Sequence, residues 1–283
     1  MERICDLHAH SYHSDGSFSP AQLLQMGQEA GLSALALCDH NTVAGLPEFM
    51  DAAKNSCVEA VPGVELSTEY EGTELHILAL FVRPEHYDVI TQLMEDFRRR
   101  KEQSNIALVE ALCKAGMKLD YGKIKQGTKD GFVNRVHVAM EMIEKGYTSS
   151  VQEAFKTYLK PGGGYYTPPQ RLDAFEAIRF IKSLGAVAVL AHPFLNLNEQ
   201  ELRKFLPKAV QSGLDAMETM YAKYDAGTTA LAGALAQEYG LLCSGGSDFH
   251  GDCKPDISLG TGRGELRIPY GFLEKLKQRK KDR

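Results

Sequence analysis

The chain has 283 residues, of which 43% are hydrophobic and 24% charged, a composition typical of a globular protein. Its net charge of -5 argues against a protein held on nucleic acid by its overall field. We find no secretory signal and no apolar run long enough to span a membrane, so we expect a cytoplasmic protein. The six cysteines are scattered without a C-x-x-C pair, which favours reduced thiols over a disulfide framework.

The first fifteen residues hold the pattern around which the chain is organised. A short strand-like run that begins at Ile4 carries His8 and His10, and alternation along a strand sends both imidazoles to the same side. Neutral imidazole binds Zn²⁺, Mn²⁺ or Fe²⁺ well, and Asp6 is placed to orient one ring through its distal N–H. An isolated H-x-H is more often a surface pair, so this interpretation depends on the rest of the chain.

Helical and strand-like segments alternate over the next part of the chain. The patterns predict helices over residues 20–30 and 47–56, the first of them capped by Ser19 and ended by Gly31. They predict strands over residues 35–38, 58–61, 64–66 and 75–78, with a hairpin turn at Glu71-Gly72 before the last strand.

The pattern changes after Pro84. One long helix is predicted over residues 88–115, and further helices over 134–145 and 151–159, with no strand before Gln170. We therefore expect a discontinuous barrel domain of residues 1–97 and 171–283, interrupted by a helical insertion, or lid, of residues 98–170.

The expected insertion is positively charged. It holds 13 Lys and Arg against 7 Asp and Glu, a net charge of +6 that leaves -11 for the remainder of the chain. Four of the positive charges form a basic cluster at residues 98–101, which is either a solvated helix face or a cap over an anionic substrate. A glycine stretch at residues 160–166 lacks the G-K-[ST] of a P-loop and is interpreted as a link back to the barrel.

The alternation of strands and helices then resumes. Helices are predicted over residues 172–183, 199–212 and 228–239, and the sequence ends in a predicted helix with a basic tail at residues 275–283. Buried strands are predicted over residues 186–191, 216–218 and 241–244.

Metal-binding side chains recur at one position in this pattern. Six of the nine histidines lie at, or just after, the C-terminal end of a predicted strand: His8, His10, His40, His76, His192 and His250. Glu65 and Asp248 share this placement, and Asp15 follows the first strand. The C-terminal face of the strands carries the active site in α/β barrels, so we interpret these residues as one site. We expect His13 and His86 to lie outside it.

The motifs that carry these residues resemble the PHP family, the polymerase and histidinol phosphatase phosphoesterases. The matching segments are D-x-H-x-H at 6–10, S-D-G at 14–16, D-H at 39–40, P-G-V-E at 62–65, His76, A-H-P at 191–193 and S-D-F-H at 247–250. The helical interruption is similar to the branch of small-nucleotide phosphatases with an insertion. This resemblance implies an α/β fold, a distorted (β/α)7 TIM-like barrel. It also implies three divalent metal ions, with Mn²⁺ as the expected ion and Fe²⁺ or Zn²⁺ as alternatives.

The resemblance also implies how the ions would be bound. The first ion would be held by His8, His10, Glu65 and Asp248, the second by Glu65, His76 and His192, and the third by Asp15, His40 and His250. Three carboxylates against three divalent ions leave a surplus of about +3, which suits a phosphate dianion. A hydroxide held near Glu65, Asp248 and His192 would attack phosphorus in line.

The insertion contains candidate substrate contacts. Residues 134–137, N-R-V-H, resemble a G-R-P-H segment in which Arg and His lie near the substrate phosphate. Arg135 and His137 keep the two functional side chains, although Arg135 alone is equally well interpreted as a surface helix charge. Tyr165 and Tyr166 are available to stack on a base.

We therefore expect a metal-dependent phosphatase that acts on small nucleotides such as AMP or a 3′,5′-bisphosphate nucleotide, with no membrane and no stable protein partner. A 5′–3′ exoribonuclease acting on short 5′-phosphorylated RNA would use the same chemistry in a more open pocket. A histidinol phosphatase and an amidohydrolase are further alternatives. The Glu65 bridge and the third ligand set argue against the amidohydrolase. A PHP-like scaffold module is the non-enzymatic alternative, although all nine ligand positions are occupied here.

Overall fold

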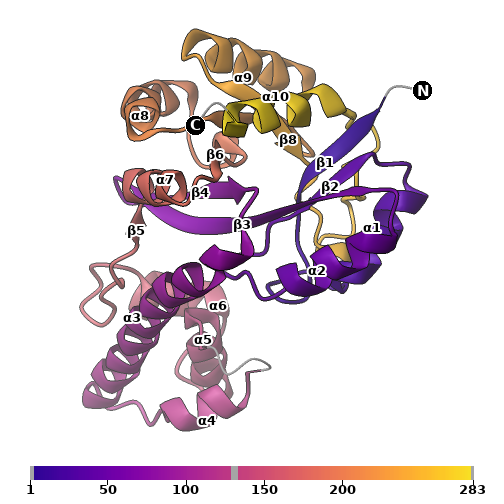
Figure 1. The fold of residues 1–283 in the computed structure, drawn as a ribbon. Coiled ribbons are helices and arrows are strands. Elements are labelled where there is room, and N and C mark those ends of the chain that lie inside the picture. Colours follow the sequence, from indigo (N-terminus) through magenta and orange to yellow (C-terminus); the bar gives the residue numbers. More distant parts are fainter. Residues whose placement is uncertain (1–2, 129–132, 282–283) are drawn as a thin grey trace. The chain divides into compact units, whose positions relative to one another are not determined.

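The computed structural model describes residues 3–128 and 133–281, and the chain divides into two compact units (Figure 1). The first unit joins residues 1–91 to residues 172–283, and the second comprises residues 92–171. Within the described residues, no helix combines the length and the apolar character needed to cross a membrane.

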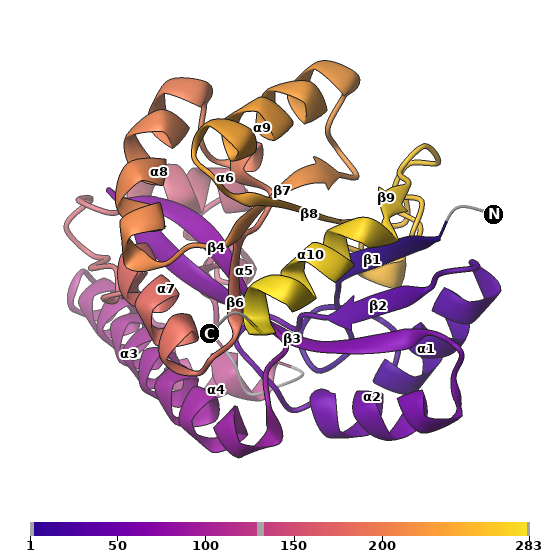
Figure 2. The same ribbon diagram turned by 45° about the horizontal axis from the view of Figure 1, so that its top comes forward.

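A nearly closed sheet is the frame of the first unit (Figure 2). Its strands are β1 (Ile4–Ala9), β2 (Ala34–Leu37), β3 (Glu59–Tyr70), β4 (Thr73–Leu80), β6 (Val187–Leu190), β7 (Ala216–Tyr221), β8 (Leu242–Gly246) and β9 (Ile268–Pro269), with β5 (Leu172–Asp173) beside β3. They follow the order β8-β7-β6-β4-β3-β2-β1-β9. Backbone hydrogen bonds of 2.9 Å, from Asp248 N to His8 O and from His10 N to Phe249 O, join β1 to the segment after β8. The expected distorted α/β barrel is confirmed.

The β3–β4 hairpin is the part of the barrel that departs from the βα repeat. Strand β4 runs antiparallel to both β3 and β6, and the predicted turn is present, with positive φ at Glu71 (48°) and Gly72 (81°). The prediction of two separate strands before this turn was wrong, because β3 is one strand of 12 residues. Gly63 lies inside it, where an added Cβ would come within 2.8 Å of Cys38 Sγ, so this glycine permits close strand packing and marks no break.

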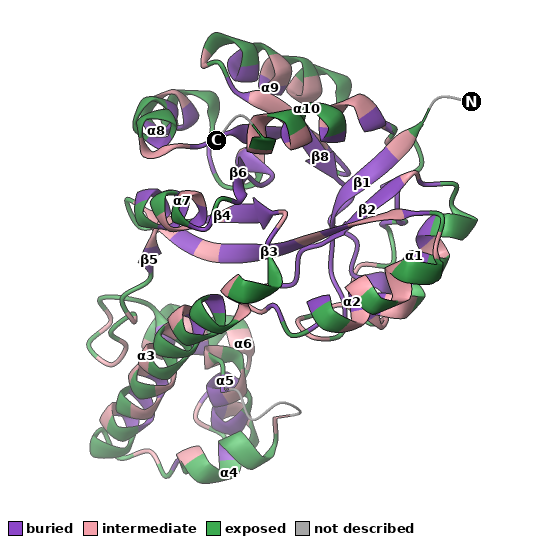
Figure 3. Ribbon diagram, viewed as in Figure 1, coloured by how far each residue is buried: buried purple, intermediate pink, exposed green. Residues whose placement is uncertain are grey.

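The helices of the first unit cover the sheet and expose their outer faces (Figure 3). They are α1 (Pro20–Glu29), α2 (Leu46–Ala52), α7 (Ala174–Ser183), α8 (Glu199–Ser212), α9 (Ala226–Glu238) and α10 (Tyr270–Lys281). The predicted cap of α1 is confirmed, since Ser19 Oγ accepts from Gln22 N at 3.1 Å. Helix α7 begins two residues later than predicted because Asp173 caps it, and α10 begins at Tyr270; residues 282–283 of its predicted end lie outside the described residues.

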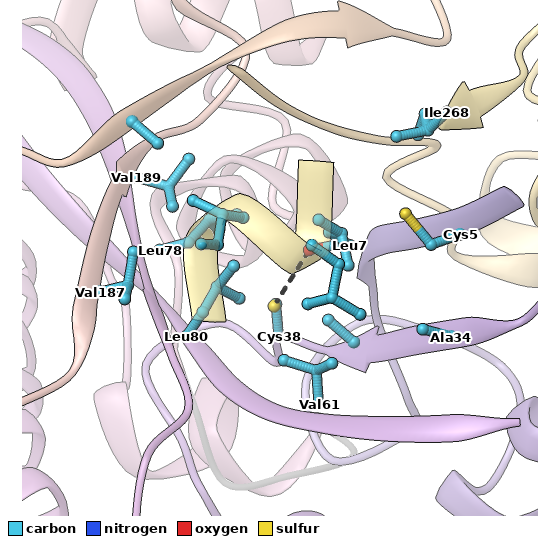
Figure 4. Close-up of a cluster of buried hydrophobic side chains, with 14 of the residues drawn as sticks. Cys5, Leu7, Ala34, Cys38, Val61, Leu78, Leu80, Val187, Val189 and Ile268 are labelled. Carbon is cyan, nitrogen blue, oxygen red and sulfur yellow. Dashed lines mark hydrogen bonds between the residues drawn. The ribbon is translucent and has the colours of Figure 1, made fainter. Parts of the chain in front are cut away.

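Apolar side chains fill the interior of the barrel (Figure 4). Cys5 and Leu7 of β1, Leu78 of β4 and Val189 of β6 point inward from three strands and are fully buried. Leu273 of α10 belongs to the same cluster, and burying a side chain of this size contributes about 1.5–3 kcal/mol. The barrel is therefore a packed core, so the polar chemistry of this unit is confined to its rims.

The second unit is helical. It contains most of α3 (Tyr87–Lys114), together with α4 (Tyr121–Gln126), α5 (Arg135–Glu144), α6 (Val151–Ala154) and a π-helical turn (Phe155–Leu159). Leu112, Val138 and Met142 belong to its own apolar core and are fully buried. The helix predicted over residues 151–159 is thus one α-helical turn followed by a π-helical turn.

Candidate metal centre

Six histidines and three carboxylates converge at one rim of the barrel. Their ligand atoms form three overlapping groups among the described residues, in each of which all the atoms lie within 4.8 Å of one another: His8, His10, Glu65 and Asp248; His10, Asp15, His40 and His250; and His40, Glu65 and His76. The ninth expected ligand, His192, places Nε2 3.1 Å from Glu65 Oε1. His13 and His86 are not part of these groups.

Strand β1 supplies the first pair of ligands. His8 lies in β1 and His10 immediately follows it, and alternation turns both rings to the same side, with centroids 5.0 Å apart. Both rings are fully buried. His40 follows β2 and forms an isolated bridge with Glu65, so the second strand also brings its histidine to this rim.

Two further ligands lie in the middle of strands, where the sequence predicted strand ends. Glu65 lies in the middle of β3, and His76 in the middle of β4, which runs in the opposite direction. Strand β2 pairs with β3 only as far as Pro62, and β6 pairs with β4 only from Ile77 to Leu80. The hairpin therefore continues beyond its neighbours at the rim, and this projecting part carries Glu65 and His76.

Glu65 is the centre of the arrangement. Ring nitrogens of five histidines lie within 3.2 Å of its carboxylate oxygens: His8, His10, His40, His76 and His192. Burial alone would raise the pKa of Glu65, but the histidines, with His8 contributing most, hold it well below its usual range. Two histidines face Oε1 and three face Oε2, a geometry expected of a carboxylate that bridges two ions.

Unpartnered buried atoms show that the site fits metal ions. The following atoms are buried and lack a hydrogen-bond partner in the described structure: Nε2 of His8, both ring nitrogens of His10, Nδ1 of His40, Nε2 of His250 and Oε2 of Glu65. Buried polar atoms are normally hydrogen-bonded, so converging nitrogen and oxygen atoms without partners require another species to satisfy them. A mixed imidazole and carboxylate set suits Mn²⁺, Fe²⁺ or Zn²⁺.

The charge states of the site match this role. Burial raises the pKa values of Asp248 and Asp15, but the neighbouring histidines outweigh burial and hold both below the usual range, so both carboxylates are ionised. Burial lowers the pKa of His40 to about 4, which leaves a neutral imidazole. Burial opposes the charge on His76 as well, but Glu65 and then Glu74 raise its pKa to about 10, so an ion bound there must displace a proton.

Glu218 supports two of the candidate ligands. Its Oε1 lies 2.9 Å from Nδ1 of His8, and its Oε2 accepts from the backbone N of His192 at 2.6 Å. With Nδ1 donating to Glu218, Nε2 of His8 is left as the nitrogen that faces Glu65 and an ion. Glu218 ends the strand predicted over residues 216–218, and the structure shows that it supports the ligands.

Asp6 does not orient a histidine ring, so that prediction was wrong. Its carboxylate accepts from Ser247 N at 2.9 Å, Ser247 Oγ at 2.5 Å and Gly260 N at 2.8 Å. The backbone N of His8, which lies in the same strand, also donates to it at 3.3 Å. Asp6 therefore fixes the loop immediately before Asp248.

Asp39 fixes the loop that carries Asp15. It accepts from Ser11 N and Ser11 Oγ, and from Ser14 Oγ, each at 2.7 Å. Sequence reasoning quoted this residue only as part of the D-H motif. Its neighbour His40 is the candidate ligand, so one dipeptide supplies both a ligand and the support of another.

Tyr221 and Lys254 hold one oxygen of Asp248, and sequence reasoning missed both. The Tyr221 hydroxyl donates to Asp248 Oδ2 at 2.9 Å, and Lys254 Nζ does so at 2.8 Å. The other oxygen, Oδ1, lies 3.2 Å from Nε2 of His10 and faces the ligand group. Burial, reinforced by Asp248, raises the pKa of Tyr221, which therefore remains a hydrogen-bond donor.

Two candidate ligands adopt strained backbone conformations. His192 has φ 28° and Asp248 has φ 56°, in the left-handed region that disfavours side chains with a Cβ. Such conformations cost of the order of 1–3 kcal/mol each and persist only where surrounding contacts enforce them. Here Glu218 holds the N–H of His192, and the carbonyl of His8 holds the N–H of Asp248.

Arg135 and His137 lie at the start of α5 in the second unit. Arg135 Nη1 donates to the carbonyl of Leu159 at 2.8 Å, and the guanidinium lies 4.3 Å from the centre of the Tyr166 ring. His137 Nδ1 accepts from the backbone N of Asn134 at 3.0 Å, so Asn134 and His137 cap the helix. The predicted contacts of Arg135 and His137 with substrate remain a prediction.

Comparison with known proteins gives a consistent assignment. The PHP domain family matches residues 6–165 of the chain. The chain is 34% identical to a 5′-3′ exoribonuclease from Haemophilus influenzae, over 89% of this chain and 92% of that protein. It is 27% identical to a 3′,5′-nucleoside bisphosphate phosphatase from Chromobacterium violaceum, over 87% of this chain and 86% of that protein. A solved structure from Bifidobacterium adolescentis, described as a metal-dependent phosphoesterase, matches with a TM-score of 0.72 and 25% identity over 98% of this chain and 96% of that one.

The family match covers more than half of the chain, and the relatives are matched over nearly their whole length. The fold, the convergent histidines and carboxylates and these similarities agree on one assignment. This chain belongs to the PHP family and is a metal-dependent phosphoesterase.

Proposed function

We propose that the chain hydrolyses a phosphate ester on a nucleotide unit that has phosphate on both its 3′ and 5′ sides. A 3′,5′-bisphosphate nucleotide and the 5′-phosphorylated end of a short RNA both contain this unit. They differ in whether the 3′ phosphate is terminal or is esterified to the next nucleotide of an RNA chain. The observation that carries the reaction class is the rim where five imidazoles surround Glu65. The two relatives, an exoribonuclease and a bisphosphate phosphatase, support the substrate class.

Nine ligands form three sets in this proposal, with Mn²⁺ as the preferred ion and Fe²⁺ or Zn²⁺ as alternatives. The sets are His8, His10, Glu65 and Asp248; Glu65, His76 and His192; and Asp15, His40 and His250. When bound, divalent ions supply a hydroxide at neutral pH and neutralise charge on the phosphoryl group.

The residues of the chain orient the parts of this site. Glu65 presents one oxygen to each of two groups of histidines, as a bridging ligand must. Glu218 contacts Nδ1 of His8 and leaves Nε2 as the nitrogen that faces the ligand group, and Tyr221 with Lys254 directs Oδ1 of Asp248 to the same group. These contacts prepare the ligands in advance, so little rearrangement is needed when substrate binds.

Arg135 and His137 are the proposed contacts to a substrate phosphate. A guanidinium binds phosphate through two parallel N–H bonds, and this planar geometry favours Arg over Lys. Arg135 already lies over Tyr166, so a nucleotide bound by the guanidinium would meet an aromatic ring beside it. A cytoplasmic location, where nucleotides and RNA ends are found, is part of the same proposal.

A substrate comparison with added Mn²⁺ tests the proposal. We expect the highest kcat/KM for adenosine 3′,5′-bisphosphate or for a 5′-phosphorylated oligoribonucleotide, at least tenfold above AMP, glycerol phosphate and histidinol phosphate. The matched control is the same oligoribonucleotide with a 5′ hydroxyl, which should be a poor substrate. Release of 5′ mononucleotides would favour the exoribonuclease form of the activity. A preference for histidinol phosphate or glycerol phosphate would contradict the proposal.

A further inference from the structure

A cleft in the first unit opens between the loop after β6 and the loop after β7. Its volume is about 600 Å³, within the range of about 300–1,000 Å³ of small-molecule sites. Its lining includes Phe194, Leu195, Asn198, Lys223, Tyr224 and Leu231. None of these residues belongs to the ligand groups described above, so the cleft is a separate part of the surface.

Aromatic rings connect this cleft to the metal centre. Phe194 comes two residues after the candidate ligand His192, and its backbone N donates to the Tyr224 hydroxyl at 2.9 Å. The ring of Tyr221 lies 5.4 Å from that of His192 and 5.2 Å from that of Tyr224, measured between centroids. Tyr221 is buried and does not line the cleft, but it also donates to Asp248, so it links Tyr224 of the lining to the ligand set.

The lining combines flat apolar surface with a few polar groups. The rings of Phe194 and Tyr224 lie 5.9 Å apart at 73°, and Leu195 is 42% exposed beside them. Aromatic faces of this kind bind nucleobases by stacking, largely without regard to base identity. Lys223 is exposed and lines the cleft as well, which adds a positive charge for an anionic ligand.

The N-terminal ends of two helices also line the cleft. Asn198 is the N-cap of α8, and Thr228 lies in the first turn of α9; both residues line the cleft. Hydroxyl and amide groups at such positions are suited to the hydroxyls of a ribose. Glu199 lines the cleft too, and Arg203, which also binds Glu238 at 2.7 Å, donates to its carboxylate at 2.9 Å.

We propose that this cleft binds the base and ribose of the nucleotide whose phosphate lies at the metal centre. The inference rests on the proposed function and adds a specificity site to it. The base packs against Phe194 and Tyr224, and Leu231 forms part of the apolar wall. Phosphate esters without a base gain nothing from these contacts, so the cleft separates nucleotides from simple phosphate esters.

Filling the cleft tests the inference by direct binding. Leu231→Trp places a large side chain in the cleft, whereas Ala230→Trp places the same side chain at the neighbouring exposed position of α9. Equilibrium dialysis of AMP against the Mn²⁺-loaded protein should show a Kd raised at least tenfold by Leu231→Trp and changed less than twofold by Ala230→Trp. Equal Kd values for the two variants would overturn the inference.

Kinetics give a second readout and separate this inference from the proposed function. Leu231→Trp should lower kcat/KM for adenosine 3′,5′-bisphosphate 10–100-fold while leaving glycerol phosphate within twofold and metal content unchanged. Equal losses for both substrates would overturn the inference. A protein that binds AMP through the cleft but releases neither phosphate from any nucleotide nor mononucleotides from a 5′-phosphorylated oligoribonucleotide would refute the proposed function and leave the cleft assignment standing. Should Leu231→Trp fail to fold, Phe194→Leu and Lys223→Ala carry the same expectation of weaker AMP binding, and unchanged binding in both would overturn it.

Discussion

Replacing Glu218 by glutamine keeps the shape of the side chain and removes its charge. Glu218 lies between two donors, Nδ1 of His8 at 2.9 Å and the backbone N of His192 at 2.6 Å. A glutamine offers one acceptor oxygen and one NH₂ group, so at one of these two contacts the NH₂ group must face another N–H donor. If His8 changes tautomer to avoid it, the proton moves to Nε2, the nitrogen that faces the ions.

We expect Glu218→Gln to weaken metal binding by about 10–100-fold, or ~1.4–2.7 kcal/mol, the usual range for a group that orients a metal-binding histidine. A buried donor without a partner also costs about 1–3 kcal/mol of stability, so the chelated protein should unfold at a lower temperature. Mn²⁺ titration by calorimetry and thermal unfolding in chelator measure the two effects. Glu29→Gln, at an exposed position of α1, is the matched control. A Kd for Mn²⁺ within twofold of wild type, together with an unchanged melting temperature, would refute the reasoning.

Three further predictions address the ligands, the substrate contacts and the ions. Asp248→Asn and His192→Ala should each abolish phosphate release while circular dichroism shows a retained fold, and full activity in both would remove these residues from the site. Arg135→Ala should lower kcat/KM on a phosphorylated nucleotide by roughly 10–100-fold, ~1.4–2.7 kcal/mol, with metal content unchanged; unaltered kinetics would restrict Arg135 to its contacts with Leu159 and Tyr166. Chelation should lower the melting temperature, since a single site filled at 100 times its Kd contributes about 2.7 kcal/mol, and scanning calorimetry that shows no shift would contradict it.

The barrel could be predicted because its local signals are strong. Buried strand runs alternate with capped amphipathic helices, and each helix boundary depends on residues close in sequence, as at Ser19. The β3–β4 hairpin was only partly predictable. Pro62 and Gly63 have the composition of a break, and only the packing of Gly63 against Cys38 shows that the strand continues.

The candidate ligands could be recognised because each lies on, or just after, a strand-like run of distinctive composition. Their supporting residues could not, because those contacts cross the barrel between distant parts of the chain. Glu218 and His8 are 210 residues apart, and Asp6 and Ser247 are 241 apart. Spacing in the sequence holds no information on such pairs, so Asp6 was assigned to one of the two neighbouring histidine rings although it binds a distant loop.

Phosphate release from adenosine 3′,5′-bisphosphate, measured as Mn²⁺ is added back to chelator-treated protein, tests the central claim most directly. We predict no release without metal, a rate that rises and saturates with Mn²⁺, and no recovery in Asp248→Asn at the same concentrations. The same rate before and after chelation would contradict the account. So would the absence, at every concentration of Mn²⁺, Fe²⁺ or Zn²⁺, of both phosphate release from this substrate and mononucleotide release from a 5′-phosphorylated oligoribonucleotide.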